Sequence, residues 1–164
     1  MSKALRFDVC VETLQQKVCL NIPCIIKVVS NILRIQKVRQ AKLSIVFVTE
    51  GKIRILNRKY LKRFFATDVL AFDFTNQTHA QKATFKKIDR LDGEIIVSID
   101  AALKQAKMYD APLDKEITLY IIHGILHLQG YDDHQPADVR RMRKKEEELL
   151  SLVGKRIERI VLRT

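Results

Sequence analysis

Residues 121–134 have the sequence IIHGILHLQGYDDH, an apolar run interrupted by two histidines four positions apart. We expect a helix over about 114–128 that ends near Gly130, because glycine commonly terminates helices. Side chains four residues apart lie on one face of a helix, so His123 and His127 can present two imidazole nitrogens to a single ion. The stretch therefore predicts a metal-binding helix in the C-terminal half of the chain.

The turn after Gly130 is expected to supply a third ligand, from Asp132, Asp133 or His134. The alternative is a pair of core histidines hydrogen-bonded to carbonyl groups. Three of the four histidines lie within residues 123–134, and this clustering favours a metal site. Imidazole and carboxylate ligands suit one Zn²⁺ ion best, although nickel, copper, iron and manganese also accept them. Zinc with an open position implies hydrolysis, because it activates water and polarises phosphoryl or carbonyl oxygens.

Two more polar residues, Glu116 and Tyr120, fall on the same helix face as the histidines. Buried polar groups need partners, so Glu116 or Tyr120 is a candidate to orient a ligating imidazole. The zincin motif H-E-x-x-H has a glutamate directly after its first histidine, whereas this chain has Gly124 there. This difference argues against a zincin peptidase. The glycine also permits close approach of backbone or substrate.

The rest of the chain alternates strands and helices without a Pro- or Gly-rich linker, so we expect one α+β domain over residues 1–164. Hydrophobic patterns predict four strands, at about 4–11, 43–48, 67–73 and 94–99. Further helices are predicted from Pro23 and at about 50–63, 101–108 and 137–151, with an edge strand or tail at 156–163. Together these elements predict one mixed sheet of about four strands packed by helices.

Local signals refine these boundaries. Thr49 and Asp100 are placed to cap the helices that follow them, and Asp92-Gly93 is typical of a turn into the strand at 94–99. A long polar loop precedes that turn, and its His79 is expected to lie outside the site.

The formal net charge of +11 is concentrated in residues 1–66, which hold 14 Lys/Arg against 3 Asp/Glu, while residues 67–164 hold 16 of each. A one-sided basic surface attracts polyanions, so nucleic acid is the expected partner, with a merely solvated basic face as the alternative. The helix at 50–63 is predicted to point Tyr60 inward and to carry Arg54, Arg58 and Lys62 in a surface stripe that suits a phosphate backbone.

No apolar stretch approaches the roughly 20 residues that a membrane span needs, and residues 1–8 lack the apolar run of a signal peptide. Cys10, Cys19 and Cys24 form an odd set without a C-x-x-C spacing, which is typical of reduced thiols. We therefore expect a cytoplasmic protein with no membrane partner and no small-molecule cofactor.

The sequence HGILHLQGYD at 123–132 resembles the signature of the YbeY family of bacterial endoribonucleases. Three other segments resemble the family in the expected order: LNRKY at 56–60, TDVLAF at 67–72, and GEIIVS at 93–98 followed by Asp100. The resemblance spans about residues 43–148. It implies a zinc-dependent endoribonuclease that acts on single strands. It also implies roles in rRNA maturation, including the 3′ end of small-subunit rRNA, and in ribosome quality control at the small ribosomal subunit.

One departure from the family pattern concerns the metal ligands. The family's third metal histidine lies ten residues after the first, where this chain has Asp133, and His134 follows one residue later. An extra residue in the turn would bring His134 into place, and we favour it. The alternative is Asp133, which would give a site of two histidines and one carboxylate. The predicted metal ligands are thus His123, His127 and His134 (or Asp133).

A second departure concerns an arginine that directly follows the tyrosine in the family and is implicated in activity. This chain has Leu61 at that position, so Arg58, Lys62 or Arg63 is expected to supply the charge. The resulting catalytic prediction is His123 with Arg58 and Arg63.

Two other functions fit parts of the sequence. A non-catalytic, zinc-stabilised ribosome assembly or RNA-binding factor would have a closed metal site, for example with both Asp133 and His134 as ligands. A metal-dependent hydrolase of peptides or small molecules would have a narrow pocket without a basic lining.

Overall fold

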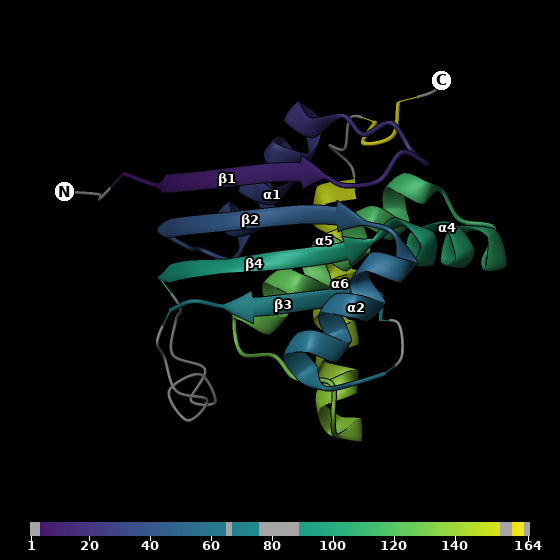
Figure 1. Cartoon of the computed structure of the whole chain (residues 1–164). Helices are drawn as coiled ribbons and strands as arrows, with labels where there is room; N and C mark the ends of the chain where they lie inside the picture. Colours follow the sequence, from purple (N-terminus) through teal and green to yellow (C-terminus); the bar gives the residue numbers. More distant parts are fainter. Residues whose placement is uncertain (1–3, 65–66, 76–88, 155–158, 163–164) are drawn as a thin grey trace.

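The structure is a computed structural model that describes residues 4–64, 67–75, 89–154 and 159–162 (Figure 1). Its strands are β1 (Arg6–Thr13), β2 (Gln40–Val48), β3 (Val69–Asp73) and β4 (Arg90–Ser98). Its helices are α1 (Ile22–Ile35), α2 (Glu50–Leu61), α4 (Ile99–Met108), α5 (Leu113–Leu128) and α6 (Pro136–Gly154). His79 lies outside the described residues.

The four strands form one mixed sheet in the order β1-β2-β4-β3. The pairs β1/β2 and β2/β4 are parallel, whereas β3 runs antiparallel to β4 and closes one edge. This arrangement confirms the predicted α+β fold with a mixed four-stranded sheet.

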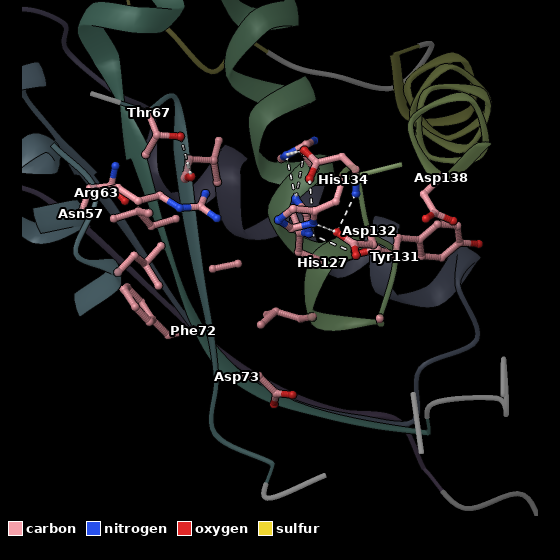
Figure 2. A pocket seen from close by; sticks show the side chains of 18 of the residues that line it. Asn57, Arg63, Thr67, Phe72, Asp73, His127, Tyr131, Asp132, His134 and Asp138 are labelled. Atoms are coloured by element: carbon pink, nitrogen blue, oxygen red, sulfur yellow. Dashed lines mark hydrogen bonds and ion pairs between the residues drawn. The ribbon is translucent and has the colours of Figure 1, made fainter. Parts of the chain in front are cut away.

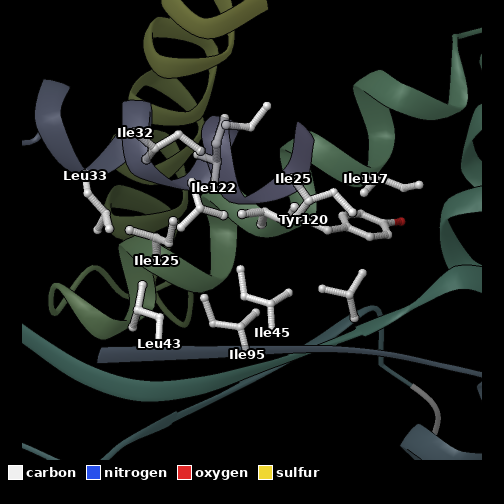
Figure 3. Close-up of a cluster of buried hydrophobic side chains, with 14 of the residues drawn as sticks. Ile25, Ile32, Leu33, Leu43, Ile45, Ile95, Ile117, Tyr120, Ile122 and Ile125 are labelled. Atoms are coloured by element: carbon white, nitrogen blue, oxygen red, sulfur yellow. The ribbon is translucent and has the colours of Figure 1, made fainter. Parts of the chain in front are cut away.

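Helices cover the two faces of the sheet unequally. Helices α1 and α5 lie against one face with α6 behind them, while α2 crosses only part of the other (Figure 1). On the first face, Ile45 and Ile95 from adjacent strands pack below α1 and α5, whose Ile25 and Ile125 are fully buried (Figure 3). Burial of such side chains is the main favourable term in folding, and it fixes α5 against the sheet.

Close contact between α5 and the sheet depends on Gly124. A Cβ atom at this position would lie 2.5 Å from Cγ2 of Ile95, so any larger residue would push the helix away. The close approach expected at this glycine is therefore to a strand, and it sets how far the histidines stand from the sheet.

The expected turn at Asp92-Gly93 is wrong, because β4 begins at Arg90 and both residues lie inside the strand. A Cβ atom at Gly93 would lie 2.5 Å from the carbonyl oxygen of Phe72 on β3. The glycine therefore permits tight strand contact rather than a change of direction.

Two cap predictions have different outcomes. Thr49 caps α2 as expected and accepts a hydrogen bond from the backbone N–H of Lys52. The cap of α4 is Ser98 rather than Asp100, because the helix begins two residues earlier than predicted. The Asp100 carboxylate instead accepts a hydrogen bond from the Glu50 N–H and pairs with Lys17.

Helix α2 ends sooner and faces differently than predicted. Lys62 adopts a left-handed conformation with φ of 54° and terminates the helix, so it does not extend the Arg54–Arg58 stripe. Tyr60 is exposed, and the buried polar position is taken by Asn57.

In the described part of the C-terminal segment, residues 159–162, Val161 forms an isolated antiparallel bridge with Leu20. The Asp114 carboxylate at the start of α5 secures it by accepting hydrogen bonds from the N–H groups of Ile160 and Val161. Among the described residues, none of the helices combines the length and the apolar character of a membrane-spanning segment.

Candidate metal centre and its pocket

The two histidines of α5 point the same ring nitrogen at a common point. Nε2 of His123 and Nε2 of His127 are 2.9 Å apart. The turn after α5 brings a carboxylate to the same place, with Oδ2 of Asp133 at 3.7 Å from each nitrogen. The arrangement thus unites two imidazoles and one carboxylate, contributed by a helix and the turn that follows it.

The other ring nitrogen of each histidine is engaged in a hydrogen bond. Nδ1 of His123 lies 2.6 Å from Oε1 of Glu146 on α6, and Nδ1 of His127 lies 3.1 Å from the carbonyl oxygen of Tyr131. A carbonyl oxygen only accepts, so Nδ1 of His127 carries the proton and its Nε2 lone pair is available. These contacts replace the predicted orienting role of Glu116 and Tyr120.

Electrostatics keep at least one imidazole in the neutral form that a metal requires. Burial lowers the pKa of His127, and the neighbouring His123 lowers this pKa further. A neutral imidazole at physiological pH can donate its lone pair without first releasing a proton.

The donor set fits a single zinc ion. Its three atoms form a triangle with sides of 2.9, 3.7 and 3.7 Å, whose circumscribed circle has a radius of about 2.0 Å, close to Zn–N and Zn–O bond lengths. Two imidazoles and a carboxylate are also ligands that zinc accepts. Among the described residues, this group offers three ligands rather than the four of a closed structural site.

The structure places His134 elsewhere. Its Nδ1 pairs with the carboxylate of Asp132 and lies 4.0 Å from Oδ1 of Asp133, and its side chain is 62% exposed. The pair raises the pKa of His134 and lowers that of Asp132, each mainly through their hydrogen bond. Asp133, which occupies the tenth position after His123, is therefore the residue that the structure brings beside the two histidines.

A pocket of about 930 Å³ opens beside the histidines (Figure 2). One wall comes from β3 and the end of α2, and the other from the end of α5, the following turn and the first part of α6. The lining includes acidic, basic and apolar side chains, among them Arg63, Phe74, Asp132 and Arg141. It is wide and partly basic, unlike the narrow site expected of a small-molecule hydrolase.

A family model described as Endoribonuclease YbeY matches residues 11–154. This chain belongs to the YbeY family. An Anaeromyxobacter dehalogenans protein named Endoribonuclease YbeY is 40% identical over 114 residues, covering 70% of this chain and 55% of that protein. A Syntrophus aciditrophicus protein of the same name is 30% identical over 148 residues, covering 88% of this chain and 89% of the other. The YbeY match thus extends over about half of the first relative and most of the second.

A solved structure has a similar fold. The solution structure of a Thermotoga maritima protein has a TM-score of 0.59 and 20% sequence identity, covering 90% of this chain and 90% of that one. At this identity the likeness shows a shared fold alone.

The structure distinguishes the basic residues considered for the YbeY arginine position. Leu61, which occupies that position, lines the pocket, and so does Arg63. Arg63 extends toward the imidazoles from the opposite wall (Figure 2). Among the described residues that line the pocket, Arg58 is absent, and its guanidinium lies 5.4 Å from the centre of the Phe64 ring.

Sequence reasoning missed the contribution of α6. Glu146 holds His123, and Asp138 and Arg141 line the pocket. Glu146 follows His123 by 23 positions and belongs to a different helix, so no helical spacing connects the two. The only sequence signal is a glutamate within a charged helix, and solvated helices show the same pattern.

Proposed function

We propose that this chain is a zinc-dependent endoribonuclease that acts on single-stranded regions of rRNA in the cytoplasm. The observation that carries the proposal is the convergence of His123, His127 and Asp133 beside a pocket that Arg63 enters, in a chain of the YbeY family. Maturation of the small-subunit rRNA 3′ end and ribosome quality control, in contact with the small subunit, belong to the same proposal.

His123, His127 and Asp133 would hold the ion. A bound zinc ion supplies Lewis acidity, which activates water and polarises a phosphoryl oxygen. The chain's own contribution is to present two Nε2 lone pairs in the correct tautomer. Glu146 and the Tyr131 carbonyl do so by engaging Nδ1 of each ring.

Arg63 provides a fixed positive charge at the opposite wall of the pocket. Phosphodiester cleavage places additional negative charge on the phosphate oxygens, and a preorganised cation stabilises that charge. Because a guanidinium donates to two oxygens at once, we assign Arg63 to the scissile phosphate. Arg58, at the outer end of α2, is assigned to neighbouring phosphates.

The proposed RNA substrate fits the charge distribution. All of the net charge of +11 arises from residues 1–66, which include α2 and its C-terminal end beside the pocket. Such a surface attracts a polyanion and releases counterions on binding, so RNA affinity should fall steeply as salt rises.

Cleavage of a single-stranded rRNA fragment by pure protein tests the proposal. Zinc-loaded wild type, a chelated sample and His123→Ala are compared, with bound metal and thermal stability measured for each. Cleavage only by the zinc-loaded wild type supports the enzyme. If wild type binds one zinc ion and rRNA without cutting, while His123→Ala loses metal and stability together, the chain is instead a zinc-stabilised ribosome assembly factor.

A further inference from the structure

Three aromatic side chains are exposed in or next to the wall of the pocket that faces the histidines. Phe64 is 75% exposed, Phe74 57% and Tyr60 55%. We call these three residues the aromatic rim. Phe74 lines the pocket directly, and the other two flank Leu61 and Arg63, which also line it. Exposed aromatic rings in and next to the wall of a pocket are typical of a surface that binds a ligand or partner.

Positively charged side chains lie close to two rings of the rim. The Arg58 guanidinium lies 5.4 Å from the centre of the Phe64 ring, and the Lys59 ammonium lies 5.2 Å from the centre of the Tyr60 ring. Tyr60 is also braced by Phe72, with ring centres 5.4 Å apart in an edge-to-face arrangement. At the C-terminal end of α2, two of the three rings of the rim therefore each have a positive charge beside them.

We propose that the aromatic rim stacks the bases that flank the scissile phosphate, with Phe64 as its principal platform. The inference rests on the proposed RNA substrate and names residues that bind it. Single-stranded nucleic acid offers both a flat π surface and a charged backbone, and proteins bind it through aromatic rings set among cations. Arg58 and Lys59 would then contact phosphates while the rings contact bases.

Charge favours RNA over an apolar protein as the occupant. Residues 58–64 contain Arg58, Lys59, Lys62 and Arg63 and no acidic residue. Docking an apolar protein surface here would desolvate these cations without providing counter-charges, which is costly. A single-stranded RNA supplies the counter-charges, because each nucleotide brings one phosphate for a cation and one base for a ring.

The test measures binding of a short fluorescent single-stranded RNA and of matched RNAs carrying one abasic nucleotide, at 4 °C, with RNA integrity checked afterwards. Wild type is compared with Phe64→Ala, Phe64→Trp and Ile55→Ala. Ile55 is a matched control because it is an apolar α2 residue that is 64% exposed and does not line the pocket. Thermal melting confirms that each variant is folded.

We expect Phe64→Ala to weaken binding of intact RNA by about 5- to 100-fold, as loss of one stacked base does, and Phe64→Trp and Ile55→Ala to bind as wild type does. At one abasic position, wild type and Phe64→Ala should bind equally. The inference is overturned if Phe64→Ala binds intact RNA as tightly as Ile55→Ala does, which would leave the rim to a protein partner. The inference is also overturned if Phe64→Ala weakens binding by the same factor for every abasic RNA, whatever the position of the missing base.

The two proposals fail separately. If wild type cuts RNA and Phe64→Ala binds RNA as tightly as wild type, base stacking by the aromatic rim is refuted and the proposed endoribonuclease activity stands. If wild type binds RNA through Phe64 but never cuts it, the proposed endoribonuclease activity is refuted and base stacking by the aromatic rim stands.

Discussion

Helix α5 carries two pairs of polar side chains on one face, and the two pairs differ in what surrounds them. Glu116 and Tyr120 in the N-terminal half are buried, and burial is the main cause that raises the pKa of each. His123 and His127 in the C-terminal half open onto the pocket, and their Nε2 atoms converge with Asp133. Helical spacing is shared by all four residues, so it does not separate a core pair from a metal site. What distinguishes the metal site is that lone pairs from different elements converge on one point.

The largest expected effect separates the two halves of the helix. His127→Ala should lose stoichiometric zinc and reduce RNA cleavage by more than about 100-fold, because it removes a ligand rather than an outer partner. Tyr120→Phe should keep both properties, since its ring belongs to the core (Figure 3). Metal content by mass spectrometry and a cleavage assay on the same samples give the answer. Equal metal loss in both variants would erase the distinction between the two pairs.

A second comparison sharpens the identity of the third ligand. Asp133→Ala should lower zinc affinity by about 100-fold or more, because Oδ2 lies 3.7 Å from both Nε2 atoms. His134→Ala should change it by less than about threefold, because that imidazole pairs with Asp132 instead. Competition with a chromogenic chelator measures both affinities. The reverse order of effects would identify His134 as the ligand.

A smaller effect is expected for the outer partner on α6. Glu146→Gln should weaken zinc binding by about 10- to 100-fold, because it removes the carboxylate that fixes the His123 tautomer. Glu147→Gln is the matched control, since that side chain is exposed on the same helix. The chelator competition applies here as well, and indistinguishable affinities would show that Glu146 has no positioning role.

The smallest effect concerns the buried acid at the other end of α5. Burial raises the pKa of Glu116, so the folded state holds its proton more tightly than the unfolded state. Stability is therefore lost as the pH rises from about 4.5 through the folded pKa, and the ionised carboxylate destabilises the fold at pH 7. Glu116→Gln should melt at a higher temperature than wild type at pH 7, and this gain should shrink toward pH 4. A gain that stays constant with pH would show that ionisation is not its cause.

Much of the fold could be predicted because it depends on local patterns. The apolar periodicity of α1, the β-branched run of β2 and the Thr49 cap are each encoded within a few residues. The failures arose where a distant element took over. Gly93 looks like a turn residue, but its role is to let Phe72 and Leu128 approach β4.

The candidate site was predictable to the same extent. The spacing of His123 and His127 predicts two donors on one helix face, which the structure places together. The third donor depends on the path of the turn after Gly130, and side-chain chemistry alone allowed either Asp133 or His134. The contact between Glu146 and His123 could not be predicted from the sequence, because only the packing of α6 on α5 brings the two residues together.

A crystal structure of the zinc-loaded protein tests the central claim most directly. The account predicts one zinc ion, located by its anomalous signal, at about 2.0–2.2 Å from Nε2 of His123, Nε2 of His127 and Oδ2 of Asp133. Zinc coordinated by His134 instead of Asp133, or by both together as a closed four-ligand site, would contradict it.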